Sequence, residues 1–239
     1  MRVALLFAAF LVAWGNVVSS LLGPTATLPG GSVAFAIAGV ALTSASLVVA
    51  RARGAGVRAL FGSRREILVG AVIGAFGASL AAIVALAFLR FIAPAITGAP
   101  VEYGPLARVT SQQLAAHIAL LLPLGVVLPE EIAFRGTLLA VALREIAQTP
   151  AVLLSAAAFA LWHGAVIVAT VSDTTLAPPS PWFAFACLAA LAVVFAGGAL
   201  FTLLRLRTRT IATTVMAHWL FNAVLLVGLW AHPLGPPSR

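Results

Sequence analysis

The chain has 239 residues, of which 62% are hydrophobic and only 8% are charged, and its mean hydropathy is +1.13. This composition excludes a water-soluble fold. The formal net charge of +8 comes from arginine, since the sequence contains no lysine, and the single cysteine, Cys187, excludes a disulfide framework or a thiolate zinc site.

Apolar stretches that are long enough to cross a bilayer recur along the chain. About 20 helical residues cross ~30 Å of hydrocarbon. Barrel strands alternate apolar and polar residues, whereas Ile67–Leu89 and Pro181–Leu204 are apolar on every face. We therefore predict an all-α polytopic transmembrane helical bundle that forms one integral membrane domain over residues 1–239. The predicted spans are Val3–Leu22, Ser32–Ala50, Ile67–Phe91, Gln112–Ala147, Ala151–Val171, Trp182–Leu204 and Thr210–Trp230.

The long region Gln112–Ala147 can make one crossing or two, which gives seven or eight spans. The arginine-rich loops Arg51–Arg65 and Arg205–Arg209 should both face the cytoplasm by the positive-inside rule. An even number of crossings must then separate them, which favours one long helix kinked at Pro123 and Pro129. The prediction is seven spans with a cytoplasmic N-terminus. The lysine-free composition is typical of a GC-rich bacterial genome, so we predict the bacterial cytoplasmic membrane.

The same topology predicts the surroundings of the loops. Anionic lipid head groups at Arg51–Arg65 and Arg205–Arg209 account for the arginines, so no nucleic acid is expected as a partner. The loops Pro94–Thr110 and Ser172–Pro181 fall on the opposite side of the membrane. Three glycines with small-residue spacing on the third span should let a neighbouring helix approach closely; they are Gly70, Gly74 and Gly77.

A few strongly polar side chains lie inside the predicted spans, where hydrocarbon makes them costly. Of the six acidic residues, only Glu130 and Glu131 lie well within a span. His163 lies within the fifth span and His218 within the seventh. Counted at 1.5 Å per residue from the cytoplasmic helix ends, these positions fall at one depth, roughly 14–22 Å. We therefore predict a single polar site near the middle of the membrane.

Residues four positions apart share one face of a helix. The pairs that this spacing defines are Glu131 with Arg135, Phe159 with His163, and His218 with Asn222. An ion pair between Glu131 and Arg135 leaves Glu130 without a local cation, which suits Glu130 to general-base chemistry. Histidines facing Glu130 can share its proton or donate to a developing negative charge. The Asn222 amide suits an oxyanion hole.

These residues resemble three motifs of the CAAX-protease-and-bacteriocin-processing (CPBP) family of intramembrane proteases. The stretch EEIAFRG at Glu130–Gly136 is similar to the family's E-E-x-x-x-R motif. FALWH at Phe159–His163 is similar to F-x-x-x-H, and HWLFN at His218–Asn222 to H-x-x-x-N. The motifs occur in the family's order, within a core that we place at residues 112–230. The spans within residues 1–93 carry no motif.

The resemblance implies an endopeptidase that hydrolyses a peptide bond of a membrane-associated protein or peptide with water activated on glutamate. It implies that Glu130 is the base and that His163 holds or polarises the water. It further implies that His218 and Asn222 stabilise the oxyanion, with Glu131, Arg135 and Phe159 in support.

Two questions stay open at this point. Zinc is an alternative to metal-free catalysis, with Glu130, His163 and His218 as the ligands, although the sequence lacks H-E-x-x-H. We favour catalysis without a cofactor. The alternative functions are a non-catalytic membrane scaffold or bacteriocin-immunity factor, and a proton-coupled transporter. The sequence leaves the oligomeric state and the substrate's identity undetermined.

Overall fold

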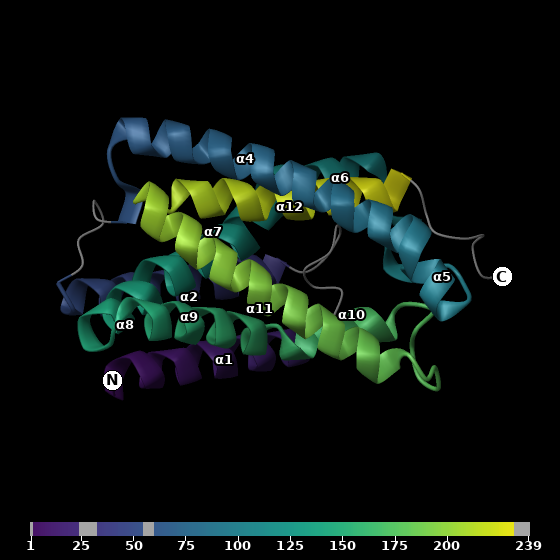
Figure 1. Ribbon diagram of the computed structural model, residues 1–239, viewed down its shortest axis with the longest axis horizontal. Coiled ribbons are helices and arrows are strands. Elements are labelled where there is room, and N and C mark those ends of the chain that lie inside the picture. The colour runs from purple at the N-terminus through teal and green to yellow at the C-terminus, as the bar shows by residue number, and fades with distance from the viewer. Residues whose placement is uncertain (1, 24–32, 55–59, 232–239) are drawn as a thin grey trace.

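A computed structural model describes residues 2–23, 33–54 and 60–231, and it is an elongated bundle of helices (Figure 1). Within these ranges, six helices are long and apolar enough to cross a membrane, or seven if the bent pair α9–α10 counts as one span. This confirms the predicted all-α membrane fold. The longest elements are α1 (Arg2–Leu22), α2 (Val33–Ala52), α4 (Arg64–Ala87), α9 (Gln148–Trp162), α10 (Gly164–Ser172), α11 (Phe183–Thr208) and α12 (Ala212–Ala231).

The long fourth span is one continuous helix, Ser111–Glu145, of 35 residues. This confirms the prediction of one long helix in this region. Pro123 lies in a wide π-helical segment, which accommodates a residue that has no N–H to donate. In the most apolar 18-residue stretch of this helix 56% of the residues are buried, whereas in that of α11 only 11% are buried. This helix therefore forms the centre of the bundle. Its parts are α6 (Ser111–Ala116), η4 (His117–Val127), α7 (Leu128–Glu131), η5 (Ile132–Leu138) and α8 (Leu139–Glu145).

The two ends of the bundle differ in character. The last turns of α2, α8 and α11 and the first turn of α4 lie at one end, at the left of Figure 1. These turns carry six arginines, Arg51, Arg64, Arg65, Arg144, Arg205 and Arg207. Residues 55–59 of the predicted loop Arg51–Arg65 lie outside the described residues. At this end the Arg144 guanidinium donates to the Gly54 carbonyl over 3.2 Å.

The loops at the opposite end pair with each other, as expected for two loops on one side of a membrane. They are Pro94–Thr110, which contains most of α5 (Ala93–Thr97) and the short 3₁₀ turn η3 (Gly104–Arg108), and Ser172–Pro181. Tyr103 forms an isolated antiparallel bridge with Thr174, and the Gly104 N–H donates to the Asp173 carbonyl over 3.3 Å. Burial, together with the nearby Asp173 carboxylate, raises the pKa of Tyr103 to about 12. The pairing closes this end of the bundle.

Small residues form the seam along which α4 packs against α12. The buried positions on α4 are Gly70, Gly74, Ala78 and Ala82, which repeat every fourth residue. A Cβ atom at Gly70 would collide with Thr213, and one at Gly74 with the Thr213 backbone. Gly77 faces open space, so the prediction holds for Gly70 and Gly74 and is wrong for Gly77. The seam follows a four-residue repeat, and Gly77 falls on another face.

An aromatic core joins the N-terminal helices to the helices that carry the motifs. It contains Leu11 of α1, Leu42 of α2, Phe134 of η5, and Phe159 and Trp162 of α9. The Phe134 ring meets the rings of Phe159 and Trp162 edge-on, at centroid distances of 5.2 and 5.6 Å. These edge-on contacts between rigid rings fix the rotation of η5 relative to α9. They thereby also fix the positions of the polar side chains on the two helices.

Candidate active site

The two adjacent glutamates lie in α7, at the centre of the bundle. Glu130 is 4% exposed and Glu131 is fully buried. Neighbouring residues on a helix point about 100° apart, so the two carboxylates meet different partners. A carboxylate without water needs hydrogen-bond donors or a cation, and the two residues differ sharply in how this need is met.

Glu131 is held by a buried network of charges. Its Oε1 accepts from Arg135 Nη1 over 3.2 Å and lies 2.9 Å from His218 Nδ1. The guanidinium also donates from Nη2 to the Gly198 carbonyl over 3.4 Å, and it stacks 3.9 Å from the centroid of the Phe159 ring. The predicted ion pair is therefore present, and it is shared with a histidine from α12.

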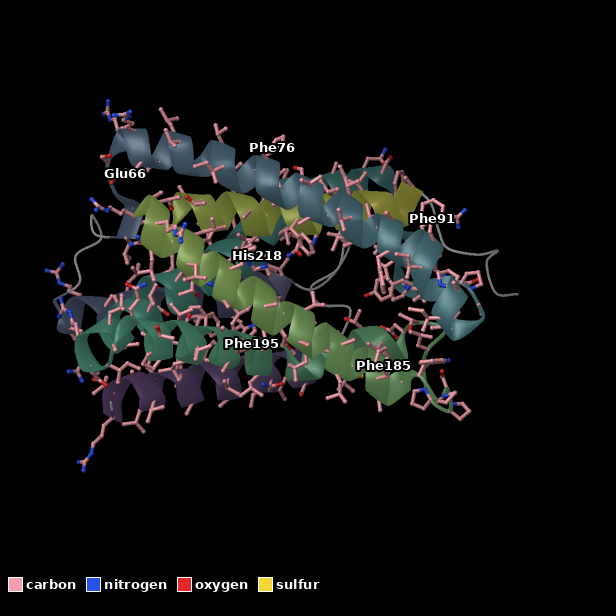
Figure 2. All side chains as sticks on the ribbon, in the orientation of Figure 1. Glu66, Phe76, Phe91, Phe185, Phe195 and His218 are labelled. Carbon is pink, nitrogen blue, oxygen red and sulfur yellow. The ribbon has the colours of Figure 1, made fainter. Side chains whose placement is uncertain are left out.

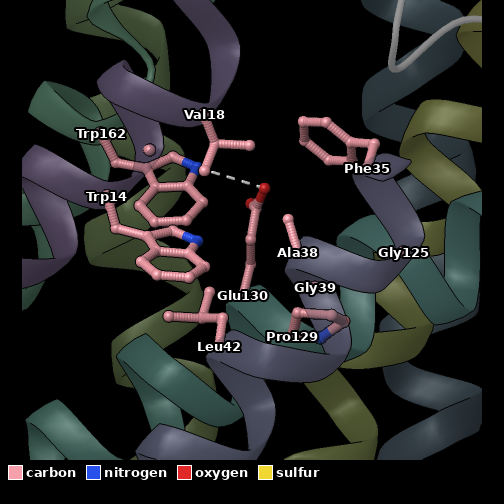
Figure 3. A pocket seen from close by; sticks show the side chains of 11 residues that line it. Trp14, Val18, Phe35, Ala38, Gly39, Leu42, Gly125, Pro129, Glu130 and Trp162 are labelled. Atoms are coloured by element: carbon pink, nitrogen blue, oxygen red, sulfur yellow. Dashed lines mark hydrogen bonds between the residues drawn. The ribbon is translucent and has the colours of Figure 1, made fainter. Parts of the chain in front are cut away.

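Glu130 is less completely held. Its Oε1 accepts from Trp162 Nε1 over 3.3 Å, as Figure 3 shows. Its Oε2 lies 3.7 Å from His163 Nε2, which is beyond a good hydrogen bond. Within the part of the chain that the structure describes, this buried oxygen has no hydrogen-bond partner. Glu130 thus keeps one carboxylate oxygen available for chemistry.

His163 stands at the break between α9 and α10, which bend by 42° there. Its Nδ1 lies 2.7 Å from the Phe159 carbonyl. A carbonyl only accepts, so Nδ1 carries the hydrogen and the neutral ring presents a lone pair at Nε2. That lone pair faces Glu130. With 18% of its side chain exposed, His163 is more accessible than the two glutamates.

His218 is directed toward Glu131 and not toward Glu130. The carboxylate accepts from Nδ1, so Nε2 is left free to contact a ligand. The ring stands edge-on to Phe159 at 6.0 Å and tilted to Phe201 at the same distance, and Figure 2 shows it midway along the bundle. Asn222 follows one helical turn later on α12, is half-buried, and makes no side-chain hydrogen bond within the described residues.

A small cavity adjoins the Glu130 carboxylate. Its volume is about 10 Å³, which is the room that one water molecule needs. Figure 3 shows the carboxylate pointing between Trp162 and Val18 on one side and Phe35 on the other. The walls come largely from α1 and α2, through Trp14, Val18, Phe35 and Leu42 among others. The N-terminal helices therefore form part of the site although they carry no motif.

The three polar segments fall within one stretch that matches a known family. Residues 112–224 match the model of the type II CAAX prenyl endopeptidase family, Rce1-like. Over this region, which is slightly less than half of the chain, the protein is similar to that family. No curated protein and no solved structure matches the chain. The match confirms the resemblance to the CPBP family, and the six or seven candidate spans among the described residues identify an integral membrane protein.

The donors in this CAAX endopeptidase region do not gather into a zinc site. Among the described residues, no three His, Cys, Asp or Glu side chains lie close enough together to hold a metal ion. The donors form two pairs, Glu130 with His163 and Glu131 with His218. A catalytic zinc needs three protein ligands around one point, and this arrangement does not fit that geometry. Catalysis without a metal stays a prediction.

Two side chains beside the CAAX endopeptidase motifs were missed by sequence reasoning. Trp162 donates to Glu130, and Asn16 on α1 bonds to the backbone on both sides of His163. Asn16 had a usable signal, because an amide in an apolar span needs a partner. Trp162 had none, since an indole within an apolar span is ordinary.

Proposed function

We propose that this protein is an intramembrane endopeptidase in which Glu130 activates a water molecule. The observation that carries the proposal is the pair of free acceptors at the centre of the bundle: Glu130 Oε2, buried and without a hydrogen bond, 3.7 Å from His163 Nε2. Both residues lie within the segment that matches an endopeptidase family. Glu131 Oε2 is likewise without a hydrogen bond among the described residues, but Glu131 Oε1 is bound by both Arg135 and His218. Glu130 Oε1, in contrast, has one long hydrogen bond from Trp162, so Glu130 is the less firmly held of the two carboxylates.

The water is proposed to lie between these two acceptors. A separation of 3.7 Å allows one water oxygen to come within hydrogen-bonding distance of both Glu130 Oε2 and His163 Nε2. The water would donate one hydrogen to each and direct one of its two lone pairs at a carbonyl carbon. The cavity beside the Glu130 carboxylate has room for one water molecule.

The chemical steps balance with the residues present. The water oxygen bonds to the peptide carbonyl carbon while its proton passes to Glu130, which forms a tetrahedral oxyanion. Asn222 and His218, on one face of α12, are proposed to donate to that oxyanion, with the His218 ring carrying a hydrogen on Nε2 as well as on Nδ1. Collapse breaks the C–N bond, and Glu130 returns the proton to the leaving amine. Glu131 keeps the His218 ring oriented through Nδ1.

The substrate is proposed to be a membrane protein or a peptide held at the membrane. The site lies inside a bundle of candidate membrane spans, and the matched family is named for prenylated CAAX proteins. We further infer that the arginine-rich end of the bundle faces the cytoplasm and anionic head groups, as the positive-inside rule predicts.

The test compares the membrane peptidome of wild-type cells with that of a Glu130→Ala strain. Purified protein in lipid nanodiscs is then assayed on the candidate peptides and on a farnesylated CAAX peptide. We expect peptides that depend on Glu130 and one new C-terminus per cleavage. Glu102→Gln, which removes a carboxylate in the loop outside the spans, is the matched control and should cleave like the wild type.

The result that counts against the proposal is an unchanged peptidome together with no cleavage by the purified protein. A non-catalytic scaffold or immunity factor would keep its cellular phenotype in the Glu130→Ala strain. A proton-coupled transporter would instead lose solute uptake without any change in the peptides.

A further inference from the structure

Asn16 on α1 binds the backbone of another helix at two points. Its Nδ2 donates to the Leu161 carbonyl over 2.8 Å, and its Oδ1 accepts from the Ala165 N–H over 2.8 Å. The same Nδ2 also donates to the Val12 carbonyl within α1, again over 2.8 Å, which fixes the direction of the amide. One side chain thus uses both its donor and its acceptor across a helix interface.

The two backbone groups are those that would bond to each other in an unbroken helix. An α-helical N–H donates to the carbonyl four residues earlier, so Ala165 N–H would pair with the Leu161 carbonyl. The break at His163 separates them, and the Asn16 amide occupies the gap by bonding to each. Unpaired backbone groups are strongly unfavourable inside a bilayer. The amide therefore stabilises the bent form of α9–α10 over the straight form.

The bend decides where His163 lies. His163 is the joint residue, between the end of α9 and the start of α10. Its N–H donates to the Ala160 carbonyl over 3.0 Å, in a tightened last turn. A straight helix would replace this turn with a regular one and rotate the imidazole relative to α7, which carries Glu130.

The neighbour of Asn16 on α1 reinforces the contact. A Cβ atom at Gly15 would collide with the Trp162 ring, so α1 lies directly against the residue that donates to Glu130. The first helix thus contacts Trp162, the hydrogen-bond donor to Glu130, and the backbone on both sides of His163. It lies outside residues 112–224, the segment that matches the endopeptidase family.

We propose that Asn16 is a positioning residue that holds the α9–α10 break open and thereby sets the distance between His163 and Glu130. This inference rests on the proposed function for its effect on catalysis, but its structural part is independent of any activity.

The decisive variant is Asn16→Leu, which keeps a similar volume and removes the amide. We expect kcat for peptide cleavage to fall by about 10- to 100-fold with KM changed little, since a displacement of ~1 Å at a reacting group can have an effect of this size. Ser20→Ala, an exposed polar residue one turn further along α1, is the matched control and should leave kcat unchanged.

A double-mutant comparison separates positioning from general loss of structure. In a His163→Ala background, Asn16→Leu should cause no further loss of activity, because the residue through which it acts is already gone. A further loss as large as in the wild-type background would overturn the proposal.

A spectroscopic readout makes the test independent of catalysis. In protein labelled with ¹⁵N-histidine and assigned by single substitutions, Asn16→Leu should shift the ring-nitrogen resonances of His163 and leave those of His218 in place. If the wild type cleaves nothing, the proposed function fails, yet this measurement still decides the positioning role. Unchanged His163 resonances would overturn it.

A second variant covers the case in which Asn16→Leu does not fold. In Gly164→Ala the new Cβ would stand 3.1 Å from Asn16 Oδ1, so it presses on the amide from the α10 side. We expect a smaller shift of the same His163 resonances. No shift in a folded Gly164→Ala protein would contradict the inference.

Discussion

Glu130 and Glu131 are consecutive in the chain and buried in the same helix, but their surroundings differ. Glu131 Oε1 is bound by Arg135 and by His218. Glu130 Oε1 has one long hydrogen bond, from Trp162, while in both glutamates Oε2 has no hydrogen-bond partner among the described residues. Two carboxylates that are next to each other in the chain can therefore have different roles, one held in a charge network and the other available for chemistry. We expect loss of Glu130 to remove activity and disruption of the Glu131 network to reduce stability.

Substitution of Glu130 should have the largest effect. Glu130→Gln removes the base while its amide still fits the same space beside Trp162, so kcat/KM for peptide cleavage should fall by about 10³-fold. The free energy of unfolding in detergent should stay within ~1 kcal/mol of the wild type, since no ion pair is lost. Activity within tenfold of the wild type would assign the base to another residue.

Disruption of the other glutamate's network should act mainly on stability. Arg135→Met leaves Glu131 buried without its cation, which should lower the free energy of unfolding by about 3–5 kcal/mol. Denaturation with sodium dodecyl sulfate in mixed micelles measures this. Arg90→Met, at an exposed arginine, is the control, with an expected change below ~0.5 kcal/mol. Equal losses in both variants would refute the comparison.

A smaller effect on activity is expected from loss of the tryptophan hydrogen bond to Glu130, and a second tryptophan serves as the control. Trp162→Phe removes the donor to Glu130, and cleavage should slow by about tenfold, in keeping with a lost hydrogen bond of ~1–1.5 kcal/mol to a charged group. Trp219→Phe removes an equivalent bond to the Ile118 carbonyl, away from the glutamates. It should cost a similar amount of stability but leave kcat/KM unchanged.

The smallest expected effect is that of chelators. The possible metal ligands are divided between the two glutamates, so dialysis against a zinc chelator should leave the cleavage rate unchanged. Loss of activity on chelation, with recovery on adding Zn²⁺, would instead show that the residues rearrange around a metal when the substrate is bound.

The sequence was sufficient for the spans and for contacts within one helix. Hydropathy located the spans, and the bilayer's intolerance of charge made Glu130, Glu131, His163 and His218 conspicuous. Spacing of four residues predicted the pairing of Glu131 with Arg135, because helical geometry alone brings such residues together.

Contacts between helices were harder to predict. Whether His218 meets Glu130 or Glu131 depends on the rotation of α12 about its axis, which packing against α4 sets. The same holds for Gly77, which the sequence placed in the seam although the four-residue repeat continues through Ala78. The contributions of α1 and α2 to the cavity depend on how the first helices dock, and no local pattern encodes that.

The tight packing of α4 against α12 has a mechanical consequence. A helix that lies this close to its neighbour, through Gly70 and Gly74, loses many van der Waals contacts if it slides or separates. We therefore expect α4 to move together with α12, the helix that carries His218 and Asn222. Any force applied to the lipid-facing surface of α4, including a change in bilayer thickness, would therefore be transmitted to the residues proposed to stabilise the oxyanion.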